Sequence, residues 1–273
     1  MTYDIIVVGS GSAGLAAAIS AAENGAKTLM IEKNPALGGT TGWSVGSITT
    51  SASPHQRAMD VYDAPDDHFR DMELFHTERL HGRDNLKLRR LLVDHTPPTF
   101  DWLLSLGLVF YGPMPEPPHG QPRMHNILPN SRMFIHHLSK RARKLGVDIR
   151  ISAPMEDLIV EDRRVTGVVV DGERISADKG VILAAGDFSA NPALKQRYMP
   201  PEVARIGPFN ETSTGDWHDP ATALGGHVLN GDVALGPEIR FRPPTKTTLV
   251  RKLPPWLWLA RVVRWSIDHM PSR

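Results

Sequence analysis

A glycine-rich segment near the start of the chain carries the residues best suited to bind a ligand. Gly9, Gly11 and Gly14 follow the apolar run 5–8 with the spacing G-x-G-x-x-G. This spacing allows a tight turn, a close approach of the backbone to a pyrophosphate, and close packing of a helix on a strand. The N–H groups that begin the helix favour the anion. The segment predicts a nucleotide site formed by Gly9, Ser10, Gly11, Ser12, Ala13 and Gly14.

An acidic residue completes the pattern. Glu32 follows a second apolar run, 28–31, and stands eighteen residues after Gly14. A carboxylate there can accept hydrogen bonds from adenosine ribose hydroxyls, and it would repel the extra phosphate of NADP. Because a strand, a helix, a second strand and a terminal acid occur in register, the pattern indicates a nucleotide-binding βαβ unit. The alternative interpretation is a glycine-rich turn that binds nothing.

Residues 32–48, EKNPALGGTTGWSVGSI, indicate which nucleotide is bound. This stretch resembles the FAD-binding domain of the fumarate reductase and 3-ketosteroid Δ1-dehydrogenase flavoproteins, in which the acid is followed by a Gly-Gly pair and a Thr- and Gly-rich segment. The resemblance implies noncovalent FAD, since the chain has no cysteine and no histidine between residues 38 and 53. A surface loop rich in Gly, Ser and Thr is the alternative. The cofactor contacts that the resemblance implies are Lys33, Gly39, Thr40, Thr41 and, near the isoalloxazine ring, Gly46.

Residues 181–188, VILAAGDF, form a second buried run that ends in small residues. They resemble the A-T-G-G-F motif of the same family, which implies that Ala185 and Gly186 approach the cofactor. Asp187 replaces a glycine of that motif, and the sequence assigns no role to its carboxylate.

Residues 212–216, TSTGD, match the T-G-D-G motif of the family, so the resemblance implies a FAD contact by Asp216. Trp217 stands where the motif has its last glycine. Met155 begins a predicted strand, and the resemblance implies that its backbone meets the adenine. No catalytic acid or base is assigned.

The elements that would position these motifs indicate an α/β fold. Alternating apolar and polar residues predict half-buried strands at 147–151, 155–160, 164–170 and 174–177. We expect a Rossmann-like FAD-binding domain over residues 1–235, with a parallel sheet flanked by helices and an antiparallel β-meander. Residues 236–273 are expected to begin a capping domain that is cut short.

The segment between the first βαβ unit and the meander is rich in proline. Pro97-Pro98 predicts a break before a short helix at 99–106, and the run 112–122 predicts an irregular segment. Arg123 and His125 follow that run. A solvated turn is favoured for these two residues over a place beside the active site.

The composition is that of an ordinary soluble globular protein, with 41% hydrophobic and 22% charged residues. The net charge of +1 indicates no general attraction to nucleic acid. A chain without cysteine forms no disulfide and ligates no iron–sulfur cluster, and the 12 histidines show no metal-ligand spacing. There is no secretory signal and no run of ~20 apolar residues, so we expect a cytoplasmic protein without a metal site.

The residues from Gly236 onward are basic and rich in tryptophan. They hold eight arginines and lysines, two acidic residues, and Trp256, Trp258 and Trp265. Basic residues interleaved with tryptophan are typical of helices that lie on anionic membranes. The competing interpretation, the start of a capping domain, is favoured because the resembled family places its cap directly after the T-G-D motif.

The resemblance implies an FAD-dependent oxidoreductase that exchanges a hydride between flavin N5 and an activated C–C bond of a small carboxylate or steroid-like substrate. Family members are longer, and their second half supplies the catalytic acid, so we expect this chain to be incomplete. Two alternatives stay open. One is a catalytically silent FAD-binding fragment or partner subunit, with a partner chain that supplies the missing half, and the other is a flavin module at the membrane periphery.

Overall fold

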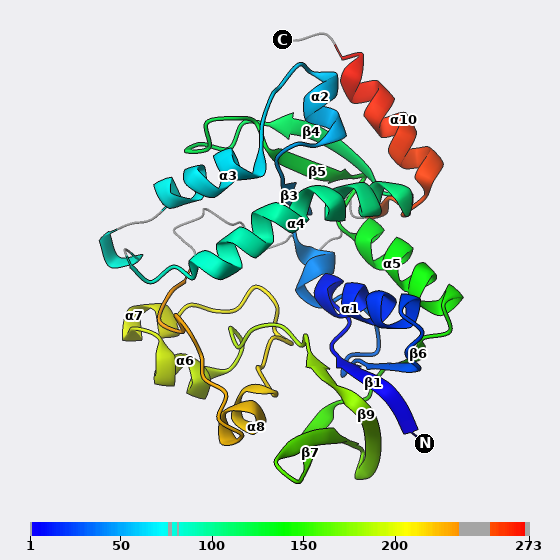
Figure 1. Cartoon of the computed structure of the whole chain (residues 1–273), viewed down its shortest axis with the longest axis vertical. Helices are drawn as coiled ribbons and strands as arrows, with labels where there is room; N and C mark the ends of the chain where they lie inside the picture. The colour runs from blue at the N-terminus through cyan, green and yellow to red at the C-terminus, as the bar shows by residue number, and fades with distance from the viewer. Residues whose placement is uncertain (1, 76–77, 81, 235–251, 271–273) are drawn as a thin grey trace. The chain divides into compact units, whose positions relative to one another are not determined.

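The computed structural model describes residues 2–75, 78–80, 82–234 and 252–270 (Figure 1). The chain forms two compact units. The first contains Met1–Trp43 and Phe134–Thr247, and the second contains Ser44–Met133 and Thr248–Arg273. The domain boundary expected at residues 235–236 lies outside the described residues, so the assignment of domains stays a prediction.

A six-stranded sheet forms the centre of the first unit, with the order β6-β2-β1-β9-β8-β7. Figure 1 labels β6, β1, β9 and β7 of this sheet. Its first four strands run parallel to one another, and β9, β8 and β7 form an antiparallel meander. The predicted α/β fold is therefore confirmed. The strands are β1 (Thr2–Val8), β2 (Thr28–Ile31), β6 (Asp148–Arg150), β7 (Met155–Glu161), β8 (Arg164–Val170) and β9 (Glu173–Leu183).

The strand β9 joins the two parts of this sheet. Residues 173–176 pair with β8, and residues 176–183 pair with β1. The sequence predicts separate strands here because small and polar residues interrupt the apolar pattern. The structure instead has one strand that serves both the meander and the parallel sheet.

The helix α1 (Ser12–Glu23) covers one face of the parallel strands. Its Leu15 and Ile19 are fully buried, as are Val7 of β1 and Met30 of β2. Burying each side chain of this size stabilises the fold by roughly 1.5–3 kcal/mol. Val8 pairs with Ile31, so the two strands end side by side and bring the residues that follow them together.

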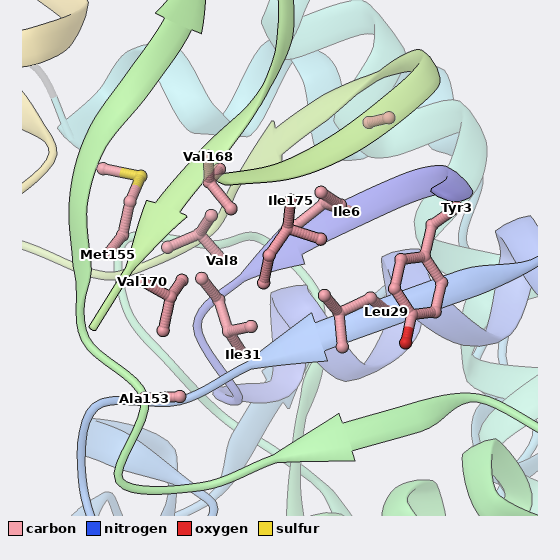
Figure 2. Close-up of a cluster of buried hydrophobic side chains, with 11 residues drawn as sticks. Tyr3, Ile6, Val8, Leu29, Ile31, Ala153, Met155, Val168, Val170 and Ile175 are labelled. Atoms are coloured by element: carbon pink, nitrogen blue, oxygen red, sulfur yellow. The ribbon is translucent and has the colours of Figure 1, made fainter. Parts of the chain in front are cut away.

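The other face of the parallel strands packs against the meander (Figure 2). Side chains of β1 and β2 point toward those of β8 and β9 in the figure. All four residues of β2 are buried, which explains why this strand is a continuous apolar run instead of an alternating one. The cluster contains Ile6, Val8, Leu29, Ile31, Ala153, Met155, Val168, Val170 and Ile175.

Shorter elements complete the first unit. Arg141 of the helix α5 pairs with Glu23 of α1 at 2.6 Å, which joins these two helices. The side chain of Asn191 caps the helix α6 by accepting hydrogen bonds from two backbone N–H groups of its first turn. These elements are η1 (Gly39–Trp43), α5 (Arg132–Lys144), α6 (Pro192–Tyr198), α7 (Pro201–Ala204) and α8 (His218–Ala223).

The second unit contains a three-stranded antiparallel sheet in the order β3-β5-β4. Two of its helices, α2 and α10, pack against β4. Its elements are β3 (Ser47–Thr49), α2 (Pro54–Ala58), α3 (Pro65–Asp71), η2 (Met72–Phe75), η3 (Glu78–Leu80), α4 (Leu86–Ser105), β4 (Val109–Met114), β5 (Met124–Leu128) and α10 (Leu257–Asp268).

The helices and strands of this unit differ from the predicted ones at two places. The helix α4 continues through Pro97 and Pro98 instead of breaking there. Buried Val93 before the prolines and buried Phe100 after them anchor both halves, so packing outweighs the lost backbone hydrogen bonds. The segment predicted to be irregular, 112–122, is irregular only from residue 115 onward, because β4 extends to Met114. The strand includes Pro113, since a register shift between Tyr111 and Met114 lets the chain bulge at the proline.

Candidate functional site

A pocket lies at the carboxyl ends of β1, β2 and β9 in the first unit. The start of α1, the short 3-10 helix η1 and the loop 210–217 contribute further lining residues. This is the edge at which open parallel sheets bind ligands. The predicted site residues that line the pocket are Gly9, Ser10, Gly11, Ser12, Ala13, Glu32, Lys33, Gly39, Thr40, Thr41, Met155, Ala185, Gly186 and Asp216.

Gly14 and Gly46, both in the described part of the chain, do not line this pocket. A Cβ atom added to Gly14 would lie 1.9 Å from the carbonyl oxygen of Gly9, so Gly14 allows α1 to pack on the first strand. Gly46 belongs to the second unit, where an added Cβ would lie 2.3 Å from Ile127. Its predicted place near the isoalloxazine ring stays a prediction.

The first turn of α1 is suited to an anion. Gly11 precedes the helix with φ −62° and ψ 177°, no side chain caps the helix, and its first turn holds no acidic residue. The backbone N–H of Ser12 donates to Oγ1 of Thr41 at 3.1 Å, which fixes the turn η1 beside the helix. The N–H groups and the helix dipole therefore present positive potential to the pocket.

The three glycines of the fingerprint differ in what surrounds them. A Cβ on Gly9, which has φ +101°, would lie 2.5 Å from the carbonyl oxygen of Ala184. A Cβ on Gly11 would meet no protein atom closer than Oγ1 of Thr41, at 3.6 Å. Protein packing thus demands glycine at positions 9 and 14, whereas position 11 has space that a bound ligand can use.

Glu32 is buried and fully hydrogen-bonded within the protein. Its Oε2 accepts from the backbone N–H of Ser10 at 3.0 Å and from the Ser10 hydroxyl at 2.5 Å. Its Oε1 accepts from the backbone N–H and the Nδ2 of Asn34, both at 2.8 Å. A carboxylate has about four acceptor sites, so a ribose hydroxyl must replace the Ser10 hydroxyl or the Asn34 amide to reach it.

Glu32→Gln is expected to lower both FAD affinity and stability. The glutamine amide would direct its own N–H groups toward the donors of Ser10 or Asn34, and hydrogen bonds to a charged acceptor contribute roughly 1.5–3 kcal/mol each. We expect a loss of about 2 kcal/mol or more in the free energy of unfolding, measured by urea denaturation. Glu161→Gln, at an exposed glutamate, is the control. Unchanged stability and FAD affinity would contradict the structural role of Glu32.

Lys33 and Asp216 form an ion pair across the pocket lining. Nζ of Lys33 lies 2.7 Å from Oδ2 of Asp216 and also donates to Oγ1 of Thr214. Burial alone would raise the pKa of Asp216, but hydrogen bonds from Lys33 and Thr214 outweigh it and hold that pKa below its usual value. The Asp216 carboxylate therefore stays ionised at neutral pH, and its hydrogen bond from Lys33 ties the loop 210–217 to the end of β2.

Several lining residues were not predicted from the sequence. Asn210 donates to Oγ1 of Thr40 at 3.0 Å, and the indole N–H of Trp217 donates to the carbonyl oxygen of Gly186 at 2.9 Å. Asn34 donates two hydrogen bonds to Glu32, and the only sequence signal for this contact was that Asn34 stands two residues after the acid. These additional lining residues include Asn34, Asn210, Thr212, Ser213 and Trp217.

Asp187 has a local structural role. Its Oδ1 accepts a hydrogen bond from the backbone N–H of Ser189 at 2.8 Å. This is the turn that aspartate side chains commonly form with the backbone two residues further on. The carboxylate therefore shapes the loop after β9.

The cavity encloses about 190 Å³. Complete small-molecule sites usually measure roughly 300–1,000 Å³. The pocket thus has room for part of a dinucleotide, and its lining combines the start of α1, the buried carboxylate of Glu32 and the apolar side chain of Met155.

Comparison with known proteins gives the family. Residues 4–254 match the FAD binding domain family. The chain belongs to this family. The family and its cofactor FAD, both expected from the sequence, are thereby confirmed.

Relatives and solved structures agree with this assignment. An NADH:fumarate oxidoreductase of Klebsiella pneumoniae is 30% identical over 252 residues, which are 89% of this chain and 26% of the relative. A cytochrome fumarate reductase of Shewanella frigidimarina is 30% identical over 82% of this chain and 40% of its own length. The chain thus spans between a quarter and two fifths of these relatives.

Two solved structures share the fold. A flavocytochrome c3 fumarate reductase in an open conformation superposes with a TM-score of 0.74 and 28% identity, over 82% of this chain and 40% of its own. A 3-ketosteroid-Δ4-(5α)-dehydrogenase of Rhodococcus jostii, bound to 4-androstene-3,17-dione, gives 0.73 and 26% over 83% of this chain and 54% of its own.

Two further findings concern the described residues alone. They contain no group of three or more histidine, aspartate or glutamate side chains that could hold a metal ion. Within the same residues, no helix combines the length and the apolar character needed to cross a membrane.

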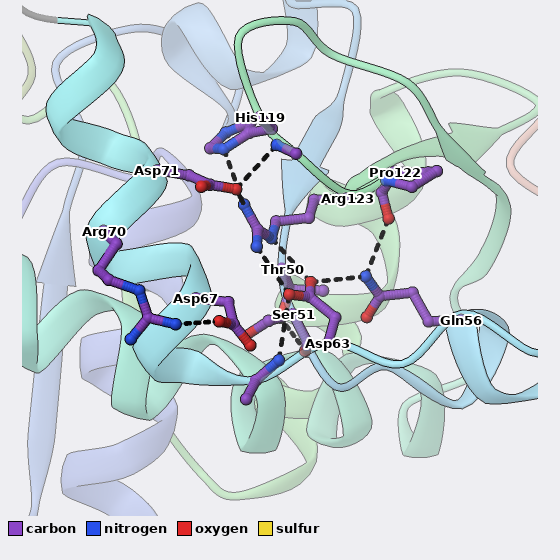
Figure 3. A network of polar contacts seen from close by, with 12 residues as sticks. Thr50, Ser51, Gln56, Asp63, Asp67, Arg70, Asp71, His119, Pro122 and Arg123 are labelled. Carbon is purple, nitrogen blue, oxygen red and sulfur yellow. Dashed lines mark hydrogen bonds and ion pairs between the residues drawn. The ribbon is translucent and has the colours of Figure 1, made fainter.

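Arg123 and His125 are buried polar residues of the second unit and do not lie in a solvated turn. Figure 3 shows the polar network around Arg123. Both side chains are fully buried. Arg123 donates two hydrogen bonds to Asp63, at 2.6 and 2.7 Å, and one to Asp71 at 2.5 Å. His125 contacts the Ser53 hydroxyl at 3.0 Å and the carbonyl oxygen of Arg123 at 2.7 Å. The solvated-turn prediction is wrong because these paired charges can be buried together.

Two buried histidines of the second unit, His68 and His125, lead us to expect a loss of stability in mild acid. Burial, with the nearby Arg123 charge, lowers the pKa of His68 to about 4, and burial likewise lowers the pKa of His125 to about 4. An unfolded histidine has a pKa near 6.5, so unfolding takes up protons between pH 6.5 and 4. We expect the free energy of unfolding to be constant above about pH 7 and to fall across that window.

Urea denaturation at intervals from pH 8 to pH 4.5 measures this effect. Nδ1 of His68 has no hydrogen-bond partner, so His68→Phe should flatten the pH dependence without a large loss of stability at pH 7. His95→Phe, at an exposed histidine, is the control. An unaltered pH profile in the His68 variant would contradict the prediction.

Proposed function

We propose that this chain supplies the FAD-binding part of an oxidoreductase that exchanges a hydride between flavin N5 and an activated C–C bond. The observation that carries this proposal is the pocket of the first unit. It gathers the glycine fingerprint, Glu32 and the loop 210–217 at the carboxyl ends of parallel strands. The family match over residues 4–254 supports FAD as the ligand of this pocket.

The residues of the chain hold and orient the cofactor in this proposal. The backbone at Gly11 and the first turn of α1 receive the pyrophosphate, and the Thr41 hydroxyl, which meets the N–H of Ser12, sets the position of η1 beside it. The Lys33–Asp216 pair holds the loop 210–217 over the same pocket. Bound FAD supplies the hydride chemistry.

The relatives support a proposal for the substrate class. The names of the Klebsiella and Shewanella proteins refer to fumarate, a small dicarboxylate, and the Rhodococcus enzyme binds a steroid ketone. In both kinds of molecule an electron-withdrawing group lies next to the C–C bond. We therefore propose a small carboxylate or steroid-like substrate with that arrangement.

The alternative is a catalytically silent FAD-binding part that acts with a partner chain. It is favoured by the short span of this chain relative to its relatives. In either case the described pocket binds the cofactor, and the two proposals differ only in the reaction.

Anaerobic reoxidation of the reduced flavin distinguishes the oxidoreductase from the catalytically silent part. The chain is loaded with FAD, reduced with dithionite, and mixed with fumarate, urocanate or 4-androstene-3,17-dione while the flavin absorbance is followed. Return of the oxidised spectrum faster than with free reduced FAD supports the oxidoreductase and identifies the substrate class. Bound FAD that none of these acceptors reoxidises supports the silent part.

A further inference from the structure

The helix α10 presents an aromatic stripe to solvent. Trp258, Val262 and Trp265 are 59%, 51% and 62% exposed. Their spacing of four and three residues places them on one face of the helix. Trp256, 52% exposed, precedes the helix and stacks on Trp258 with ring centroids 5.7 Å apart. Trp256, Trp258, Val262 and Trp265 together are called the aromatic stripe below.

The opposite face of α10 is fixed to its own unit. Ala260 is fully buried, and the helix packs against β4 and β5. Arg264 donates to the carbonyl oxygen of Phe110, and its guanidinium lies 5.6 Å from the ring centroid of Tyr111. The aromatic stripe is therefore held outward, because turning it inward would break these contacts.

The FAD-binding function does not explain this surface. The family match ends at residue 254, and α10 begins at Leu257. Soluble proteins rarely expose several large apolar side chains side by side unless the patch binds something. The helix is thus a separate feature that needs its own partner.

The charges around the stripe indicate an anionic partner. The described residues 252–270 contain three arginines and lysines and one acidic residue. Lys252 and Arg261 are exposed, and Arg264 is already bound to Asp268 at 2.8 Å. Tryptophan beside basic residues is suited to the headgroup region of a membrane, where the rings contact the acyl boundary and the cations contact lipid phosphates.

The length of α10 sets how it meets a membrane. Its 12 residues span about 18 Å, whereas the hydrocarbon core of a bilayer is about 30 Å thick. The helix can therefore lie in the interface but cannot cross it. We infer that α10 binds this protein to an anionic lipid surface, with the aromatic stripe in the headgroup region and Lys252 and Arg261 against the phosphates.

Vesicle co-sedimentation of the full chain tests this inference. We expect binding to vesicles of phosphatidylcholine and phosphatidylglycerol (3:1), weaker binding to phosphatidylcholine alone, and a decline as salt increases. Trp258→Ala with Trp265→Ala should weaken binding at least tenfold. Arg261→Gln should weaken it by about fivefold, the factor expected for one basic residue near an anionic surface.

Two controls keep the result clear. Tyr62→Ala removes an aromatic side chain of the second unit that is 87% exposed and should leave vesicle binding unchanged. All substituted side chains are exposed, so unchanged circular dichroism is expected. Absence of binding to anionic vesicles, or equal binding by the double tryptophan variant, would overturn the inference. The wild-type chain could instead be a dimer in sedimentation velocity and show no vesicle binding, while the double tryptophan variant is a monomer. That result would show that two copies of the chain meet at this face.

Discussion

Gly11→Ala is expected to raise the dissociation constant for FAD by about ten- to a hundredfold while the fold stays intact. That range corresponds to roughly 1.4–2.8 kcal/mol of binding free energy. The nearest protein atom to the new Cβ would be Oγ1 of Thr41 at 3.6 Å, and the backbone at position 11, with φ −62°, suits alanine. The loss would therefore come from the cofactor, whose pyrophosphate must approach this backbone closely.

Fluorescence titration with FAD measures the affinity, and thermal unfolding without FAD measures the fold. Gly14→Ala is the matched variant, since its Cβ would lie 1.9 Å from the Gly9 carbonyl oxygen and should prevent stable folding. Gly11→Ala should leave the melting temperature unchanged or slightly higher, because alanine restricts the unfolded chain. Wild-type FAD affinity in Gly11→Ala would show that the pyrophosphate does not lie at this turn.

Arg123→Met is expected to lower the free energy of unfolding by about 3–5 kcal/mol. The guanidinium is fully buried, and so is the carboxylate of Asp63, its main partner. Removal of the arginine would leave that carboxylate buried without its positive partner. Urea denaturation at pH 7 measures the change.

Arg197→Met is the matched control. Arg197 pairs with Asp219 at 2.6 Å, a distance equal to that of the Arg123–Asp63 pair, but its side chain is 50% exposed. Exposed pairs contribute roughly 0–1 kcal/mol, so this variant should lose little stability. Similar losses in the two variants would contradict the view that burial of the Arg123 cluster makes it important for stability.

The parts of the fold that depend on local pattern could be predicted. The apolar runs at 5–8 and 28–31, the glycines between them and the acid after them define the βαβ unit. The resulting register places Val8 opposite Ile31, and that pairing brings the turn at Ser10 to Glu32. Neighbouring strands with short connections follow from local sequence in this way.

The parts that depend on distant contacts could not be predicted. Lys33 and Asp216 are 183 residues apart, and only the folded loop 210–217 shows that they pair. The same is true of Trp217, whose indole reaches Gly186. Glu32 was predicted as a ribose ligand, but the four protein donors around it depend on the folded turn. The prediction that Arg123 lies in a solvated turn was wrong, because the sequence pattern does not show which carboxylates will pair with a charged residue.

The continuous helix α4 illustrates the same limit. Proline lacks the backbone N–H and usually ends a helix. Only the burial of Val93 and Phe100 on either side shows why this helix persists through Pro97 and Pro98.

The visible absorption spectrum of the purified chain tests the central claim most directly. The chain is incubated with FAD, separated from free flavin by gel filtration, and then denatured and filtered. We predict about one FAD per chain before denaturation and complete release of the flavin afterwards, as expected for a noncovalent cofactor. A chain that is folded by circular dichroism but retains no flavin, and shows no FAD binding in titration, would contradict the assignment of the pocket.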